Sequence, residues 1–169
     1  MARCLIISCG CRGRSLARAL LTRGHAVRGT TRSPAGLAAI EGAGAEAVLA
    51  DPDLVATLVR SFEHVGVTCV LLGSAVGGPE RLAALHGPRL EMLLTRMLDT
   101  TVRGVVYEAA GSVDAELLAA GAEIVRERCE DSRLPYALLR ADPGDHRAWT
   151  VAATGAVHSA LDGGQVGPR

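Results

Sequence analysis

The chain of 169 residues is 49% apolar yet has only four aromatic side chains, and its 18 basic residues balance 18 acidic ones. This length suits one well-buried domain, the neutral charge balance provides no field that would recruit nucleic acid, and no apolar run approaches the ~20 residues that span a bilayer. Every basic residue is arginine, since the sequence contains no lysine. We therefore expect a single domain with an aliphatic core and with no nucleic-acid or membrane partner.

The opening segment CLIISCGCRGRSLARALLTRGHAV has three interpretations. A secretion signal needs an apolar stretch of ~7–15 residues, and Gly10 and Arg12 interrupt the run too early, so we expect a cytoplasmic protein. A zinc site usually has two paired ligand clusters, whereas Cys4, Cys9 and Cys11 have no second pair. Reduced structural cysteines and no metal are therefore favoured. Cys9 and Cys11 flank a glycine in a predicted loop, so a thiol redox pair stays open.

The third interpretation is a phosphate-binding turn between a strand and a helix. Residues 4–7 are a short apolar run typical of a strand, and residues 14–23 have the periodicity of an amphipathic helix. Gly24 ends this helix, and residues 25–30 resume an extended, partly β-branched run. The segment therefore predicts one strand–helix–strand unit.

The turn of this unit places Ser8, Gly10 and Gly13 where the dinucleotide fingerprint G-x-G-x-x-G has its three glycines. The second glycine lets a pyrophosphate approach the backbone, and the third lets the helix pack close to the strand. Ser8 replaces the first glycine, which makes the tight turn. Backbone N–H groups at the helix start would bind the phosphate, and the candidate residues are Ser8, Gly10, Cys11, Arg12, Gly13 and Arg14.

The same alternation continues along the chain. Further strands are predicted over residues 45–50, 67–72, 102–107 and 136–140. Further helices are predicted over residues 34–41, 52–62, 80–86, 89–98, 114–133 and 145–161. The pairs Ser33-Pro34 and Asp51-Pro52 both have the cap-then-proline pattern that begins a helix.

Strands that alternate with helices imply an α/β fold, here one doubly wound parallel sheet of about six strands in the order 3-2-1-4-5-6. Ligands of such sheets bind at the carboxyl ends of the strands, where strands 1 and 4 meet. We expect this Rossmann-type domain to occupy residues 1–162, followed by a flexible tail over residues 163–169.

The segment SCGCRGRSLARALLTRGHAVRGTTRSP resembles the start of atypical and extended short-chain dehydrogenases/reductases, the NAD-dependent epimerase/dehydratase and NmrA-like group. The segment VRGVVYEAAGSV is similar to the fifth strand of that group, and LPYALLRADPGD is similar to its sixth. The resemblance implies an NAD(P)-binding domain. Extended members carry a substrate lobe after the sixth strand, but only about one helix follows here, so no separate substrate domain is expected.

The end of the second strand indicates which cofactor binds. NAD enzymes commonly have Asp or Glu there to bind the ribose 2′-OH, whereas this chain reads RGTTRS without a carboxylate. Arg32, helped by Thr31 and Ser33, would clamp a 2′-phosphate, and Arg12 would add a second positive charge. We therefore expect NADP, with NAD as the alternative. The competing interpretation is that both arginines are ordinary exposed residues.

The resemblance implies three more cofactor contacts. Asp51 matches the position that touches adenine, although it also suits a helix N-cap. Gly73 and Ser74, after the fourth strand, match the backbone that passes the cofactor ribose, although they also suit a flexible turn.

The standard catalytic residues of the family are missing. Its reductases pair a tyrosine with a lysine four residues later on one helix, where the lysine lowers the pKa of the tyrosine. This chain has no lysine, and Tyr107 and Tyr136 both fall in predicted strands. The serine pair at the end of the fifth strand is replaced by Ala109 and Ala110. Ordinary short-chain reductase chemistry is therefore not expected.

Glu108 and Ser112 are the remaining catalytic candidates, because they lie beside the expected nicotinamide site, and His86 would approach from the preceding loop. A buried carboxylate there would have a raised pKa and act as a base. The alternative is a carboxylate that is solvated or bound by neighbouring N–H groups.

Three classes of function stay open. The first is a cofactor-binding protein that senses NADP(H) or regulates a partner. The second is a small NADP-dependent oxidoreductase or epimerase with a non-standard acid–base residue and a small-molecule substrate, completed by a homodimer. The third is a thiol redox module that uses Cys9 and Cys11.

Overall fold

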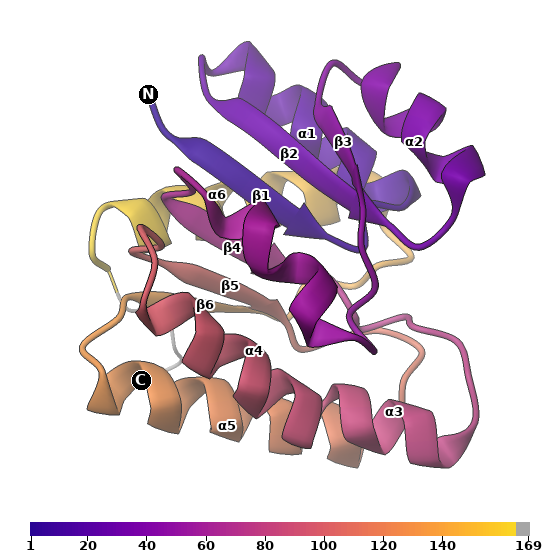
Figure 1. Ribbon diagram of the computed structural model, residues 1–169, viewed down its shortest axis with the longest axis vertical. Coiled ribbons are helices and arrows are strands. Elements are labelled where there is room, and N and C mark those ends of the chain that lie inside the picture. The colour runs from indigo at the N-terminus through magenta and orange to yellow at the C-terminus, as the bar shows by residue number, and fades with distance from the viewer. Residues whose placement is uncertain (165–169) are drawn as a thin grey trace.

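One parallel sheet of six strands, ordered β3-β2-β1-β4-β5-β6, runs through the computed structural model, which describes residues 1–164 (Figure 1). All five neighbouring pairs are parallel. The strands are β1 (Arg3–Ile7), β2 (Ala26–Thr31), β3 (Glu46–Leu49), β4 (Val67–Val70), β5 (Val105–Glu108) and β6 (Tyr136–Leu139). This order confirms the predicted doubly wound sheet. Of the predicted tail, residues 165–169 lie outside the described part of the chain.

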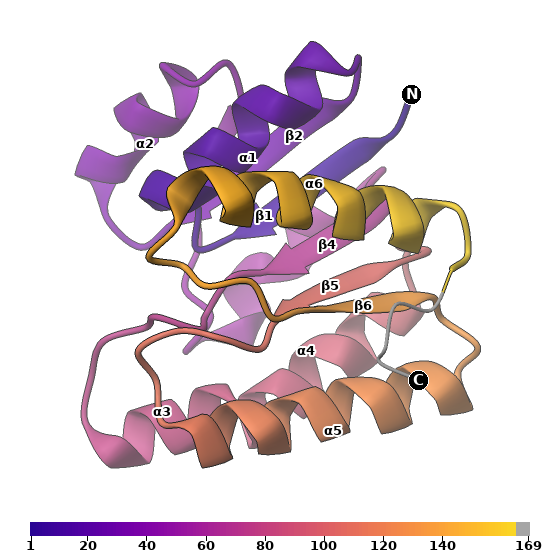
Figure 2. The same ribbon diagram turned by 180° about the vertical axis from the view of Figure 1, so that it is seen from behind.

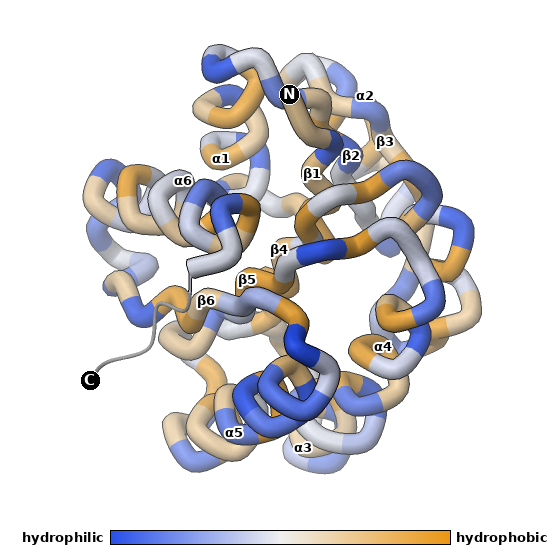
Figure 3. The backbone as a smooth tube through the Cα atoms, turned by 90° about the vertical axis from the view of Figure 1, so that its left-hand side faces the viewer, coloured by the Kyte–Doolittle hydropathy of each residue, from blue (hydrophilic) through white to orange (hydrophobic). Residues whose placement is uncertain are grey.

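Helices cover both faces of the sheet. They are α1 (Cys11–Thr22), α2 (Pro34–Glu41), α3 (Pro79–Leu85), α4 (Pro88–Leu98), α5 (Ala115–Asp131) and α6 (His146–Leu161), together with a 3-10 helix, η1 (Val55–Phe62). Figure 2 shows α1 and α6 in front of the sheet, whereas α3, α4 and α5 run below the strands. Ile40 of α2 packs into the same core as α1 and α6. The end-on view in Figure 3 likewise separates α1 and α6 from α4.

The strand β1 shows why the central strands are apolar throughout. Leu5 and Ile7 pack into the core beneath η1, α4 and α5, whereas Cys4 and Ile6 pack into the core beneath α1 and α6. All four side chains are fully buried. Because successive side chains of a strand point to opposite faces, a strand covered on both sides has no polar face.

Two helix starts differ from the sequence-based expectation. The helix α1 begins at Cys11, three residues earlier than expected, with Gly10 as its N-cap. The predicted helix start at Asp51-Pro52 is wrong, since a 3-10 helix begins only at Val55. The Asp51 side chain does accept a cap-type hydrogen bond from the Asp53 N–H (2.9 Å) through Oδ1, but the chain leaves this turn before a helix forms.

The first position of the glycine turn needs a left-handed backbone, which Ser8 adopts with a φ of 61°. This conformation costs a non-glycine residue about 1–2 kcal/mol, whereas glycine adds about 0.4–1 kcal/mol of unfolded-chain entropy. We expect Ser8→Gly to raise the free energy of unfolding by about 0.5–1 kcal/mol, measured by urea denaturation. The same exchange inside α1, Ser15→Gly, should lower it by about 0.5 kcal/mol. A loss of stability in Ser8→Gly would contradict the strain argument.

Candidate functional site

The turn between β1 and α1 leaves its backbone accessible. A Cβ atom on Gly10 would meet no atom within 4 Å, so the space above this residue is open. A Cβ atom on Gly13 would lie 3.2 Å from both Ile6 Cγ2 and Cys9 Sγ, so α1 packs tightly on β1. The Cys9 N–H donates to the Thr30 carbonyl (2.8 Å), which holds the turn against β2. The second and third glycines therefore have the surroundings that a phosphate-binding turn requires.

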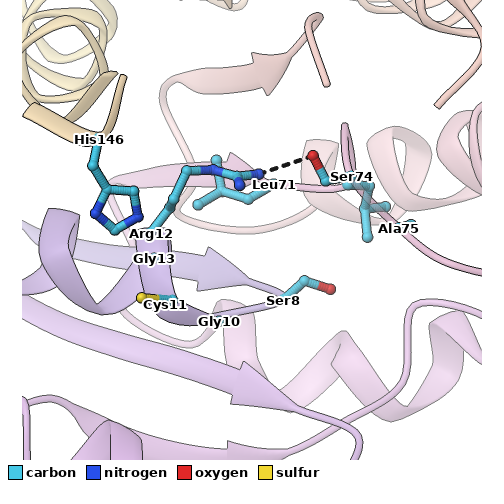
Figure 4. Close-up of a pocket in the computed structure, with 10 residues that line it drawn as sticks. Ser8, Gly10, Cys11, Arg12, Gly13, Leu71, Ser74, Ala75 and His146 are labelled. Atoms are coloured by element: carbon cyan, nitrogen blue, oxygen red, sulfur yellow. Dashed lines mark hydrogen bonds between the residues drawn. The ribbon is translucent and has the colours of Figure 1, made fainter. Parts of the chain in front are cut away.

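A cavity of about 270 Å³ lies where the carboxyl ends of β1 and β4 meet (Figure 4). Its volume is close to the lower end of the ~300–1,000 Å³ range of small-molecule sites. The lining residues come from the glycine turn, from the segment after β4 and from the start of α6: Ser8, Gly10, Cys11, Arg12, Gly13, Leu71, Leu72, Ser74, Ala75 and His146. Six of the predicted cofactor residues thus surround one cavity at the expected position.

Arg12 extends across this cavity rather than toward the end of β2. Its Nη2 donates to Ser74 Oγ and to Glu108 Oε1, both at 3.1 Å (Figure 4 shows the bond to Ser74). The guanidinium carbon lies 5.4 Å from the ring centre of Trp149, a cation–π contact. Arg12 and Arg32 pair with different carboxylates, Glu108 and Asp53. In this arrangement Arg12 is engaged away from Arg32, and its part as a second positive charge at a 2′-phosphate stays a prediction.

Glu108, at the end of β5, is fully buried and is held by two donors. Its Oε1 accepts from Arg12, and its Oε2 accepts from the Gly73 N–H at 2.9 Å. Burial raises the pKa of Glu108, while Arg12, the Gly73 N–H and the nearby Trp149 indole lower it. Of the two readings left open by the sequence, the structure has a carboxylate bound by neighbouring donors, and Glu108 does not line the cavity.

Ser112 is the other catalytic candidate, and it is exposed. Its backbone N–H donates to Ser74 Oγ at 3.4 Å, and within residues 1–164 its hydroxyl has no hydrogen-bond partner. Ser112 therefore contacts the side chain that also receives Arg12.

His86 and both tyrosines are engaged away from the cavity. The His86 Nε2–H donates to the Leu72 carbonyl (3.1 Å), so its Nδ1 accepts from the Tyr107 hydroxyl (2.6 Å). Burial lowers the pKa of His86 and raises that of Tyr107 well above its ordinary value. The Tyr136 hydroxyl donates to Glu130 Oε1 at 3.0 Å. None of these groups lines the cavity, so His86 does not reach the position expected from the sequence.

The predicted adenosine-side residues form a separate group beyond the cavity. Thr31 Oγ1 accepts from the Ser33 N–H (3.2 Å), and Ser33 Oγ accepts from the Ala35 N–H (3.3 Å) as the N-cap of α2. Arg32 is half-exposed, with its Nη1 3.7 Å from Asp53 Oδ2. The carboxylate that the end of β2 lacks in sequence is thus brought there by the loop after β3.

The two cysteines of the turn do not form an accessible dithiol. Cys9 is buried between Gly13 and Gly29, and burial raises its pKa to about 11. Cys11 is exposed. Because the thiolate is the reactive form, Cys9 is a poor nucleophile at neutral pH, and the redox-pair interpretation loses its support. Across the described part of the chain no His, Cys, Asp or Glu cluster could hold a metal.

Two side chains of this site do not stand out in the sequence. His146 is the first residue of α6 and lines the cavity, and Trp149 lies one turn later against Arg12. Asp145 caps this helix by accepting from the Ala148 N–H at 3.0 Å. The sequence could have predicted where His146 lies, because a helix that follows β6 must begin at the carboxyl edge of the sheet. Through residue 164, no helix combines the length and apolar character of a membrane span.

No protein-family model matches the chain, and no curated protein matches it. Solved structures do. A short-chain dehydrogenase/reductase superfamily protein from Agrobacterium tumefaciens with bound NAD superposes with a TM-score of 0.67 at 22% identity, over 82% of this chain and 48% of that one. A UDP-glucose 4-epimerase from Brucella ovis in complex with NAD gives 0.68 at 16% identity, over 83% and 51%.

A third structure, the triphenylmethane reductase of Citrobacter sp. complexed with NADP(H), gives a TM-score of 0.61 at 16% identity, over 81% of this chain and 48% of that one. The chain therefore spans about half the length of these structures. They confirm the Rossmann-type fold that the resemblance implied, and each of the three holds a nicotinamide dinucleotide.

Proposed function

We propose that this chain is an NAD(P)-binding protein related to short-chain dehydrogenases/reductases and epimerases. The observation that carries the proposal is the open backbone above Gly10 at the start of α1. The first N–H groups of a helix have no acceptor within it, and the Arg14 N–H is the first that bonds back, to the Gly10 carbonyl (2.9 Å). The N–H groups of Cys11, Arg12 and Gly13 remain to receive a pyrophosphate, which a helix N-terminus favours.

The other assigned residues extend this site along the carboxyl edge. In the proposal, Ser8 and Ser74 flank the pyrophosphate and ribose, Gly73 supports the backbone beside them, and Asp51 contacts adenine. Thr31, Arg32 and Ser33 receive the 2′ side of the ribose, which favours NADP(H). The free cysteines suit a reducing compartment such as the cytoplasm.

Binding, sensing or regulation is the preferred role, because the chain offers no proton donor of the usual kind. It contains no lysine, and the Tyr107 hydroxyl is already bonded to His86. The second candidate is a small oxidoreductase or epimerase, in which the nicotinamide supplies hydride transfer and Glu108 exchanges the proton. Its raised pKa suits that role, but Glu108 is buried outside the cavity, so Arg12 would have to move aside and a homodimer or another chain would have to supply the rest of a substrate site.

The cofactor preference is tested by titrating NADPH, NADP, NADH and NAD into the purified protein by calorimetry. We expect NADPH to bind about ten- to a hundredfold more tightly than NADH, the range that corresponds to a charge-assisted hydrogen bond. Arg32→Ala should remove most of this difference and leave NADH binding unchanged. Equal affinities of the unmodified protein for NADPH and NADH would refute the preference, and no binding of any of the four would refute the proposed function.

The tyrosines should not contribute to any turnover. We expect Tyr107→Phe and Tyr136→Phe to leave NADPH oxidation with simple aldehydes and ketones as low as in the unmodified protein. Tyr107→Phe should lower the free energy of unfolding by about 1–3 kcal/mol, because it leaves the buried His86 Nδ1 without its donor. A large, pH-dependent loss of turnover in either variant, with cofactor binding intact, would make the second candidate the better one.

A further inference from the structure

Three arginines from three separate segments converge on Asp53. Arg81 Nε lies 2.7 Å from Asp53 Oδ2, Arg89 Nη1 lies 2.8 Å from Oδ1, and Arg32 Nη1 lies 3.7 Å from Oδ2. We call these four residues the arginine cluster. Arg32 directly follows β2, Asp53 follows β3, and Arg81 and Arg89 belong to α3 and α4. The chain therefore gathers residues far apart in sequence at the carboxyl edge of the sheet.

The arginine cluster carries two positive charges in excess. Within residues 1–164, Asp53 is the only acidic partner of these three guanidinium groups. The Asp53 side chain is 17% exposed, so its carboxylate contacts the guanidinium groups rather than solvent. Three positive charges that lie close together repel one another. One carboxylate does not neutralise three guanidinium groups, so a bound anion would stabilise the cluster.

Most of the donors in the arginine cluster are unused. A guanidinium has five N–H donors. Among residues 1–164, Arg81 uses Nε for Asp53 and Nη1 for the Val76 carbonyl, and Arg89 uses only Nη1. The Arg32 Nη1 is too far from Asp53 for a hydrogen bond. The side chains of Arg32, Arg81 and Arg89 are 51%, 23% and 36% exposed, so the arginine cluster can be reached from solvent.

Asp53 thus fixes two of the guanidinium groups while leaving their other donors free. Phosphate oxygens accept two parallel N–H bonds from a guanidinium, and the planar group is preorganised for that geometry. The position agrees with this chemistry, because the 2′ side of a dinucleotide ribose lies near the end of the second strand of a Rossmann sheet.

We propose that the arginine cluster is a phosphate-monoester site and that it receives the 2′-phosphate of NADP(H). Arg81 and Arg89 are then specificity residues that the end of β2 alone does not indicate, and Asp53 positions their guanidinium groups. This inference rests on the proposed function for the identity of the ligand, but the phosphate site itself can be tested without a complete dinucleotide.

The test compares adenosine 2′-monophosphate with adenosine 5′-monophosphate by calorimetry. The unmodified protein should bind the 2′-isomer about tenfold more tightly or better, and Arg81→Met and Arg89→Met should each lower its affinity for that isomer by about tenfold. Both variants should keep the affinity for the 5′-isomer. Arg96→Met, which removes an exposed arginine of α4 with no ion pair among the described residues, is the matched control and should change neither affinity.

Each outcome decides the inference. If the unmodified protein does not distinguish the isomers, or if both variants keep the full preference, the arginine cluster is an ion-pair network only and the inference is overturned. If Arg81→Met loses its folded circular dichroism spectrum, the affinities of Arg89→Met alone decide the test, because the Arg89 side chain is 36% exposed. If the protein distinguishes the isomers but binds no NAD(P)H, the phosphate site is supported and the proposed function is refuted. If both variants bind NADPH as tightly as the unmodified protein, the proposed function is supported and the phosphate site is refuted.

Discussion

Arg12→Met is expected to lower the free energy of unfolding by about 3–5 kcal/mol at neutral pH, the cost of leaving a buried charge without its partner. The Glu108 side chain has no exposed surface, and without Arg12 its carboxylate would lose its charged partner and keep, among residues 1–164, the hydrogen bond from the Gly73 N–H and the nearby Trp149 indole. Urea denaturation at pH 7.5 measures the loss. The double variant Arg12→Met, Glu108→Gln should recover most of it, because a neutral amide can keep the Gly73 bond without a buried charge.

The same variant should show a characteristic pH dependence. Burial already raises the pKa of Glu108, with Arg12 opposing the rise, so removing Arg12 should raise it further. An acid whose folded pKa exceeds its unfolded value of about 4.3 binds more protons when folded, and stability then falls as the pH rises from that value to the folded pKa. The deficit of Arg12→Met relative to the unmodified protein should therefore shrink as the pH falls through the further raised pKa of Glu108 in the variant. A deficit that is independent of pH, or no recovery in the double variant, would contradict this account.

Gly13→Val is expected to weaken dinucleotide binding by about a hundredfold or more. A Cβ atom at this position already lies 3.2 Å from Ile6 Cγ2 and Cys9 Sγ, so the two γ-methyl groups of valine have no room. Overpacking of this kind forces backbone shifts, and a shift of α1 away from β1 displaces the N–H groups proposed to hold the pyrophosphate. Gly13→Ala should have a smaller effect, because Ile6 and Cys9 would have to move only slightly to make room for one Cβ atom.

Calorimetric titration with NADPH measures the effect of Gly13→Val, and circular dichroism checks that the variant is folded. Gly155→Val is the matched control, since Gly155 is exposed on α6 and a Cβ atom there would meet nothing within 4 Å. Unchanged NADPH affinity in a folded Gly13→Val protein would mean that the pyrophosphate does not lie over this turn.

The sequence by itself determined the layout of the sheet. Apolar runs such as β1 and β4 must be covered on both faces, and their alternation with helices leaves few topologies, of which the order 3-2-1-4-5-6 is one. The position of the glycine turn also followed from local rules, since Gly10 and Gly13 meet steric requirements of the backbone. At Asp51-Pro52 the cap bond forms as expected, from the Asp53 N–H to the Asp51 side chain, but a 3-10 helix begins only at Val55, because a cap alone does not make the following residues helical.

Only the tertiary structure decided the partners of the charged side chains. Arg12 was expected to add a second positive charge for a 2′-phosphate, and the structure pairs it with Glu108, 96 residues away. Arg32 instead meets Asp53, which also collects Arg81 and Arg89. Periodicity and capping rules act over a few residues and concern which face of an element is buried. The partner of a long, flexible arginine side chain depends on which loops the fold brings within its reach. A carboxylate such as Glu108 needs that partner only once the folded protein has buried it away from water.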